Sequence, residues 1–434
     1  MGVQLGGRHQ RFACGHASTV VIMEPDDRAR VVLEETRAAG HDDVAWKQGR
    51  VFSLAYYGGP QVELVAERAH AMYSSANGLN VDAFPSLKRF QSDVVARVIE
   101  WVDGGAEAAG FMTSGGTESI LMAVKAARER GRRERGIDSP NVVLPTSAHA
   151  AFEKACYYFG LESRRVAVRD DWRADVDAMS RAADENTVLF VASAPQYPQG
   201  VIDPIPEIAA LANDRGVNCH VDACMGGVTL AYMARSGESV PPWNLSVPGV
   251  TSISVDLHKY GYTAKGASVI VHRNKTLRSY QTFVTDNWLG GVYGSSGVLG
   301  TKSGGPMAAA WAVMRYLGDD GYLSLTATAR RTALRLADAV ESIDGLVLRA
   351  RPDSTLVSFG SHEQNGPDIF AVADELFRRG WYVDRQGPPP SLHCTVNASH
   401  EGTIDDFIAD VRDAVRLVGE SGGRGREGSY GTVE

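Results

Sequence analysis

A lysine that directly follows an apolar strand pattern is the sharpest chemical signal in the sequence. Residues 252–257, Ser-Ile-Ser-Val-Asp-Leu, predict a buried strand that leads into His258 and Lys259. A lysine at the edge of a buried sheet is poorly placed as a solvated surface charge. Its amine can be desolvated there and its pKa lowered, which favours formation of a Schiff base with an aldehyde. Lys259 is therefore a candidate covalent nucleophile.

Two further motifs precede this lysine. Residues 113–118, Thr-Ser-Gly-Gly-Thr-Glu, open a helical pattern, and a glycine turn at a helix N-terminus presents backbone N–H groups to an anion such as a phosphate. Asp222 ends the strand pattern of residues 219–222, where a carboxylate can keep a pyridine nitrogen protonated. Taken alone, each motif is at least as consistent with a helix cap or a turn.

The order of the three features is more specific than any one of them. Phosphate cup, pyridinium carboxylate and Schiff-base lysine follow one another as expected in fold type I enzymes that use pyridoxal 5′-phosphate (PLP). His149 follows a strand pattern and could lie over the pyridine ring, although a merely packed histidine is the simpler interpretation. We therefore expect PLP as the cofactor and no metal, with Lys259, Asp222 and His149 as the catalytic residues.

Hydrophobic patterning predicts an α/β fold: a large domain with a mostly parallel sheet covered by helices, and a small C-terminal α+β domain. Resemblance to fold type I enzymes implies that the large sheet is of the seven-stranded type. Asp203 and Pro204 indicate an N-cap and a first helical residue between two of the strands. The expected parts are an N-terminal segment that contributes to the active site and the dimer (1–92), the PLP-binding domain (93–322), the small domain (323–420) and a disordered, glycine-rich tail (421–434). The expected strands cover residues 141–144, 187–192, 219–222, 252–256, 267–271, 354–359, 381–383 and 392–396.

Composition excludes several classes of protein. The chain has 434 residues and a formal net charge of −8, which argues against a nucleic-acid-binding surface. No signal peptide or membrane anchor is evident, and no uncharged run is long enough to span a bilayer. Five scattered cysteines without a C-x-x-C pair fit reduced thiols in the cytoplasm. They are Cys14, Cys156, Cys219, Cys224 and Cys394.

At this point the sequence resembles the sphingosine-1-phosphate lyases, of the soluble bacterial type, within the group II PLP decarboxylase superfamily. The resemblance covers roughly residues 46–395. The motifs that carry it are Thr-Ser-Gly-Gly-Thr-Glu-Ser-Ile at 113–120, Ser-Ala-His-Ala-Ala-Phe at 147–152, Pro-Gln-Tyr-Pro-Gln-Gly-Val-Ile-Asp-Pro at 195–204, His-Val-Asp-Ala-Cys at 220–224 and His-Lys-Tyr-Gly-Tyr at 258–262.

The resemblance implies a role for each matched residue. Lys259 would form the Schiff base, Asp222 would pair with the pyridine nitrogen, and His149 would stack on the ring. Thr301 would reach the cofactor phosphate from the neighbouring subunit, so that the active site would need a homodimer. The other residues implied at the cofactor are Ser114, Gly115, Gly116, Thr117 and His258, and those implied at the substrate are Tyr56, Asn80 and Lys265.

Such lyases cleave a phosphorylated long-chain amino alcohol by retro-aldol chemistry, giving an aldehyde and phosphoethanolamine. Three departures from the family pattern affect this expectation. Asn80 stands in place of a histidine, Lys302 in place of an arginine and Ser303 in place of a proline. Because Asn80 is an amide, we expect either weak activity on sphingosine-1-phosphate or a substrate with a less charged polar end.

Two alternatives remain open from the sequence. An amino-acid decarboxylase would use the same cofactor, because PLP directs cleavage to whichever bond of the amine-bearing carbon stands perpendicular to its ring. A catalytically degenerate PLP-binding protein is the second alternative. The presence of Lys259, Asp222 and His149 disfavours it.

Overall fold

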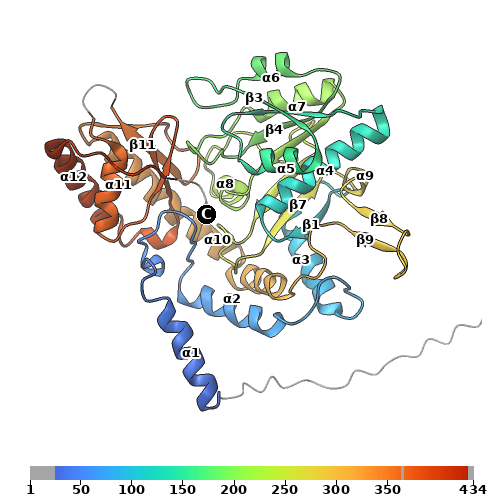
Figure 1. Ribbon diagram of the computed structural model, residues 1–434, viewed down its shortest axis with the longest axis horizontal. Coiled ribbons are helices and arrows are strands. Elements are labelled where there is room, and N and C mark those ends of the chain that lie inside the picture. Colours follow the sequence, from blue (N-terminus) through green and yellow to red (C-terminus); the bar gives the residue numbers. More distant parts are fainter. Residues whose placement is uncertain (1–24, 363–365, 429–434) are drawn as a thin grey trace, which may run out of the picture. The chain divides into compact units, whose positions relative to one another are not determined.

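The computed structural model describes residues 25–362 and 366–428 (Figure 1). The chain divides into two compact units, one up to Asp43 and one from Val44 onward. Within the described residues, the first unit contains helix α1 (Asp27–Ala39), whose N-terminus is capped by the Asp26 side chain and which buries none of its residues.

A seven-stranded sheet forms the centre of the second unit, as expected for the fold type; the patterning located five of its strands and missed the two edge strands, β1 and β3. The strand order is β1-β7-β6-β5-β4-β2-β3, and the strands from β3 to β6 are parallel neighbours. Strand β7 is antiparallel to both β6 and β1. The strands are β1 (Ala109–Thr113), β2 (Asn141–Pro145), β3 (Glu162–Val166), β4 (Thr187–Ser193), β5 (Asn218–Asp222), β6 (Ser252–Asp256) and β7 (Ser268–His272).

Helices cover both faces of the sheet, which explains why its strands read as continuous apolar runs. Side chains alternate between the two faces: Val142 and Leu144 pack with the core of helices α4 (Gly116–Arg135) and α5 (Ala151–Phe159), whereas Val143 packs on the other side. The core on that other side includes α2 (Pro60–Tyr73), α3 (Pro85–Trp101), α6 (Val176–Ala182), α7 (Ile205–Asp214), α8 (Gly226–Arg235) and the first part of α10 (Gly305–Glu341).

A four-stranded antiparallel sheet forms a second core with two further helices and the last part of α10. The expected strand at 381–383 is displaced: Trp381 lies in this core, and the strand begins at Asp384. Helix α10 runs through the expected boundary at residue 322, and Gly318 interrupts its helical conformation. The elements are β10 (Leu346–Leu348), β11 (Leu356–Ser361), α11 (Ile369–Arg378), β12 (Asp384–Gln386), β13 (Ser391–Thr395) and α12 (Ile404–Ser421).

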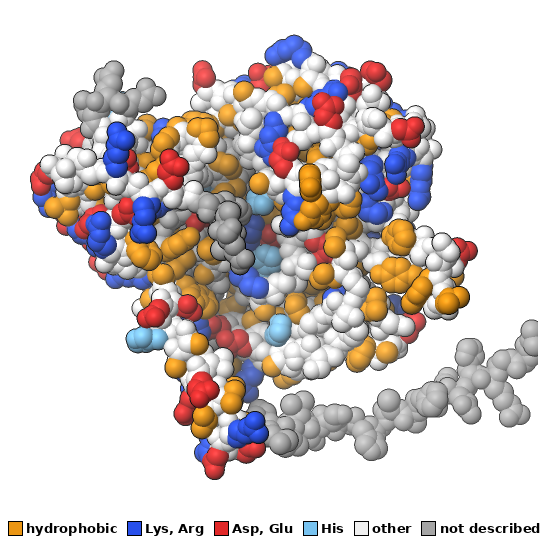
Figure 2. All heavy atoms as spheres, viewed as in Figure 1, with side chains coloured by type: hydrophobic (Ala, Val, Ile, Leu, Met, Phe, Trp, Pro, Cys, Tyr) orange, Lys and Arg blue, Asp and Glu red, His pale blue; other side chains and the backbone are white. Residues whose placement is uncertain are grey.

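Short elements complete the structure. The 3-10 helices η1 (Trp46–Gln48) and η2 (Ala398–His400) flank the small sheet in the sequence, and α9 (Lys275–Ser279) follows β7. A hairpin of β8 (Phe283–Thr285) and β9 (Tyr293–Ser295) presents exposed hydrophobic side chains, which gather at the right of Figure 2.

Of the predicted tail, residues 429–434 lie outside the described residues, while the Arg426 N–H donates to Asp374 in α11. Within 25–362 and 366–428, no helix is long and apolar enough to cross a membrane.

The expected N-cap at Asp203 is wrong. Helix α7 begins at Ile205, and the Asp203 carboxylate instead accepts hydrogen bonds from the backbone N–H groups of Ala174 (2.9 Å) and Ser193 (2.8 Å). Asp203 is only 2% exposed. Its two carboxylate oxygens accept hydrogen bonds from buried N–H groups outside the helix, because buried backbone donors need partners. Because Ser193 ends β4, this carboxylate fixes the end of a central strand.

Asp203→Ala should lower the free energy of unfolding by about 2–4 kcal/mol, because it leaves two buried N–H groups without partners. Equilibrium urea unfolding at neutral pH would measure this loss. Asp214→Ala removes an exposed carboxylate at the C-terminal end of α7 and should change stability by no more than about 0.5 kcal/mol. Equal stabilities for the two variants would contradict the assigned role of Asp203.

Candidate active site

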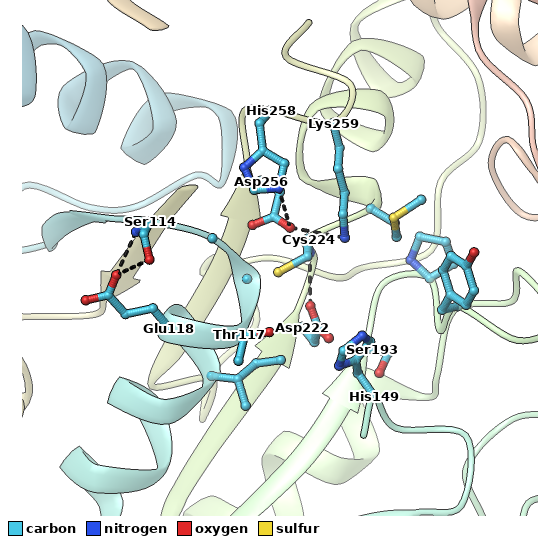
Figure 3. Close-up of a pocket in the computed structure, with 16 residues that line it drawn as sticks. Ser114, Thr117, Glu118, His149, Ser193, Asp222, Cys224, Asp256, His258 and Lys259 are labelled. Atoms are coloured by element: carbon cyan, nitrogen blue, oxygen red, sulfur yellow. Dashed lines mark hydrogen bonds and ion pairs between the residues drawn. The ribbon is translucent and has the colours of Figure 1, made fainter. Parts of the chain in front are cut away.

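A cavity of about 390 Å³ lies where the carboxyl ends of β4, β5 and β6 meet the N-terminus of α4 (Figure 3). The register aligns Ser193, Asp222 and Ser254 across the three strands, so residues at or just after the strand ends reach the same edge of the sheet. The predicted residues that line this cavity are Ser114, Gly115, Gly116, Thr117, His149, Asp222, His258 and Lys259.

Lys259 lies in the turn after β6 and points into the cavity. Its Nζ is 3.1 Å from Oδ2 of Asp256, which is 2% exposed. Burial opposes ionisation of Asp256, but the positive charge of Lys259, together with the contacts of His258 and Ser268, outweighs it and holds the pKa of this carboxyl below its ordinary value. The ionised Asp256 therefore fixes the lysine amine at the wall of the cavity.

Asp222 is the last residue of β5 and presents its carboxylate to the cavity. Its Oδ1 accepts hydrogen bonds from the Cys224 N–H (3.0 Å) and from the Ser254 hydroxyl (3.3 Å). Hydrogen bonds to the charged form favour ionisation of a carboxyl group. The side chain is thus oriented by protein donors while it borders the cavity.

His149 lines the cavity from the segment between β2 and α5. Its Nδ1 accepts a hydrogen bond from the Ala151 N–H at 3.0 Å, and burial lowers the pKa of the imidazole. A neutral ring that accepts at Nδ1 carries its proton on Nε2. His149 therefore offers a flat, uncharged ring to whatever occupies the cavity.

The glycine turn forms the wall at the N-terminus of α4. A Cβ added to Gly116 would lie 2.8 Å from both Asp256 Oδ2 and Cys224 Sγ, so only glycine permits this close approach of the helix to the strand ends. Ser114 also borders the cavity, but its N–H and its hydroxyl both donate to the Glu118 carboxylate at 2.7 Å. Its role toward a cofactor stays a prediction.

The structure places the remaining predicted residues outside this cavity. Lys265 lies beside it, because its Nζ donates to the carbonyl oxygens of Leu54 (2.7 Å) and His258 (3.3 Å) and lies 5.0 Å from the Tyr56 ring centroid. Asn80 is exposed, and its Oδ1 accepts from the Asp82 N–H in a local turn. Thr301 is exposed as well. Within a single chain, Tyr56 and Lys265 therefore lie close together beside the cavity, whereas Asn80 and Thr301 do not line it.

Sequence patterns missed several cavity residues. Asp256 had a signal, since it is a charged residue at the end of an apolar strand pattern and three positions before Lys259. Tyr197 lies in the motif at 195–204, but nothing in the sequence indicated that its hydroxyl donates to Asp384 (2.6 Å), which lies 187 positions later. Glu118 joins two segments: besides Ser114, it accepts a hydrogen bond from the Val298 N–H.

The chemistry of the lining groups fits PLP. The first turn of α4 and the Thr117 hydroxyl can hold a phosphate, since helix N-termini present free N–H groups. The Asp222 carboxylate can accept a hydrogen bond from a protonated pyridine nitrogen, and the Lys259 amine can condense with an aldehyde. Phosphate, ring nitrogen and aldehyde are the three functional ends of this cofactor.

Comparisons with known proteins agree with the geometry. The pyridoxal-dependent decarboxylase conserved domain matches residues 45–361. The sphingosine-1-phosphate lyase of Arabidopsis thaliana is 40% identical over 395 residues, which cover 89% of this chain and 72% of the relative. The chain belongs to the sphingosine-1-phosphate lyase family. The family confirms the resemblance and makes this chain a PLP-dependent lyase.

Further relatives of the lyase family support this placement. Sphingosine-1-phosphate lyase 1 of Rattus norvegicus is 39% identical over 390 residues, 89% of this chain and 68% of the relative. The solved structure of the Burkholderia pseudomallei sphingosine-1-phosphate lyase has a TM-score of 0.86 and 36% identity, and the match covers 96% of this chain and 95% of that one. A Lactobacillus brevis glutamate decarboxylase, at 18% identity and a TM-score of 0.79, covers 96% of both chains and shares the fold.

The purified lyase should carry the visible absorbance of bound PLP, and Lys259→Ala should lose it after free cofactor is removed by gel filtration. The reason is that Lys259 alone would supply the covalent link, whereas the other groups would supply reversible contacts. Lys275→Ala, which removes an exposed lysine at the start of α9, should keep the absorbance. A visible band that persisted in Lys259→Ala would show that another residue carries the cofactor.

Proposed function

We propose that this lyase cleaves the bond between the amine-bearing and hydroxyl-bearing carbons of a phosphorylated amino alcohol such as sphingosine-1-phosphate. The lyases from Arabidopsis and rat carry this substrate in their names. The observation that carries the proposal is the position of Lys265. Its ammonium donates to two carbonyl oxygens beside the cavity, which carry no full negative charge, so the cation is available to an anionic substrate group.

The residues around the cavity have distinct roles in this reaction. Bound PLP supplies an electron sink for the negative charge that develops at the amine-bearing carbon of the substrate. Asp222 keeps the ring nitrogen protonated, which strengthens that sink. Lys259, held by Asp256, is the group placed to exchange with the substrate amine and to return a proton from Nζ to the substrate carbon. His149 bounds the ring on one face.

Tyr56 and Lys265 form the proposed contact for the substrate phosphate. Part of the Lys265 side chain is exposed, but its ammonium is crowded by protein. This partial desolvation, together with the nearby charge of Lys259, lowers the pKa of Lys265 to about 8. The Tyr56 hydroxyl approaches Met225 Sδ at 3.7 Å, which orients the ring toward the cavity wall. Asn80 stays a prediction as a third contact.

For the phosphorylated substrate, kcat/KM should fall as the pH rises above about 8, because the free lyase then loses the Lys265 charge. Arginine stays charged over this range, so Lys265→Arg should move the decline to higher pH. Rate profiles between pH 6 and about 10 would measure this, with the unphosphorylated amino alcohol as the control that lacks the decline. Identical profiles in wild type and Lys265→Arg would remove Lys265 from phosphate recognition.

We also propose that the lyase works as a homodimer with a shared active site. Thr301 follows the β8–β9 hairpin and lies outside the cavity of its own chain, which suits a contact with the neighbouring cofactor. The hairpin exposes large apolar side chains, including Trp288 (60% exposed) and Leu289 (107% exposed), that a second copy could cover. A monomer mass in light scattering of the PLP-loaded protein would contradict this.

A cytoplasmic location is proposed as well. Among the described residues, Cys156, Cys219, Cys224 and Cys394 are buried free thiols. Free thiols persist in a reducing compartment. Disulfide-linked forms in freshly lysed cells would argue against this location.

The alternative activity is decarboxylation of an amino acid. The Lactobacillus brevis glutamate decarboxylase, which shares the fold, is an example of an enzyme named for it. The proposed lyase should release an aldehyde and phosphoethanolamine in equal amounts from sphingosine-1-phosphate. It should release no carbon dioxide above the Lys259→Ala background from amino acids. An aldehyde-trapping assay run beside a radiolabelled carbon dioxide assay measures both. Carbon dioxide as the faster product would establish decarboxylation instead.

A further inference from the structure

Four buried polar side chains form a ladder between β5 and β6. His220 and Asp222 lie two positions apart on β5, as Ser252 and Ser254 do on β6, so each pair points to one face of its strand. The register sets His220 beside Ser252 and Asp222 beside Ser254. None of the four is more than 9% exposed. Central strands covered on both faces ordinarily carry apolar side chains at such positions.

The hydrogen bonds of this ladder are continuous and end at the cavity. His220 Nδ1 lies 2.9 Å from Ser252 Oγ, and His220 Nε2 lies 3.3 Å from Ser254 Oγ. The Ser254 hydroxyl in turn donates to Asp222 Oδ1 at 3.3 Å. Ser252 lies at the start of β6, so the ladder leads from the far end of the strand to the carboxylate that lines the cavity.

The direction of these bonds follows from counting protons. Burial lowers the pKa of His220 to about 4, so at neutral pH its ring has one donor and one acceptor. An ionised Asp222 only accepts, so the Ser254 hydroxyl must donate to it. With that single proton used, His220 Nε2 must donate to Ser254 Oγ. His220 Nδ1 is then the acceptor for the Ser252 hydroxyl, and one tautomer satisfies the three hydrogen bonds that join the four ladder residues.

We propose that His220 is a positioning residue, which acts through Ser254 to hold the Asp222 carboxylate oriented toward the cofactor. This inference rests on the proposed role of Asp222 at the pyridine nitrogen. The fixed Nε2–H commits the serine proton to Oδ1, where it joins the Cys224 N–H. Two donors on one oxygen stabilise the charged carboxylate, and a charged carboxylate keeps the ring nitrogen protonated.

The direct test is the protonation state of the ring nitrogen, read from the ¹⁵N chemical shift of isotope-labelled PLP in the holoenzyme. His220→Phe keeps an aromatic ring against Phe152 but has no N–H, and Ser254→Ala removes the donor to Asp222. Both variants should move the shift toward the unprotonated value and lower kcat about ten- to a hundredfold. His220→Gln, whose amide can donate, should recover part of both changes.

Ser354→Ala is the matched control, because it removes another buried hydroxyl, bonded to Thr229 at 3.0 Å and outside the ladder. It should leave the ¹⁵N shift unchanged. If Asp222→Asn moves the shift while Ser254→Ala and a folded His220→Phe do not, the ladder has no positioning role. If Asp222→Asn itself leaves the shift unchanged, the proposed role of Asp222 fails, and the ladder fails with it. Should His220→Phe not fold, Ser254→Ala decides alone.

Discussion

The parallel run of β4, β5 and β6 is the constraint on which the site depends. Parallel strands end at the same edge, so their C-terminal residues gather without any contact between neighbours in the sequence. Ser193, Asp222 and the turn that holds Lys259 meet there. The edge is kept in place by Asp203, whose buried carboxylate binds the end of β4. A shift of β5 against β6 would move Asp222 away from Lys259.

Negative and positive groups meet at this edge of the sheet. Two buried carboxylates, Asp222 and Asp256, face the Lys259 amine and the N-terminus of α4. The positive charge of Lys259 holds the pKa of Asp256 below its ordinary value against the effect of burial, whereas Asp222 is oriented by hydrogen-bond donors. The two carboxylates are therefore held in place by different interactions. This difference allows one of them to serve the lysine and the other to serve a ring nitrogen.

The wall of the cavity joins parts of the chain that are far apart in sequence. The Asp384 carboxylate at the start of β12 accepts hydrogen bonds from the Tyr197 hydroxyl and from the Ser53 hydroxyl at 2.9 Å. Leu54, which follows Ser53, has φ of 63°, an uncommon conformation for a non-glycine residue. Its carbonyl oxygen accepts a hydrogen bond from the Lys265 ammonium. The small sheet and the N-terminal segment thus help to position the residues proposed to read the substrate.

The sequence by itself determined the central strands, the order of the motifs and the identity of Lys259, Asp222 and His149 as cavity residues. This was possible because a run of apolar residues indicates that the strand it forms is buried. In addition, the carboxyl ends of neighbouring parallel strands lie at the same edge of the sheet. Only the tertiary structure decided that Asp203 binds a strand rather than caps a helix, and that Asp256 pairs with Lys259. It also decided that Lys265 approaches Leu54 while Asn80 does not approach the cavity of its own chain. Periodicity says which face of an element is buried, but the partner of a polar atom is set by what packs across from it.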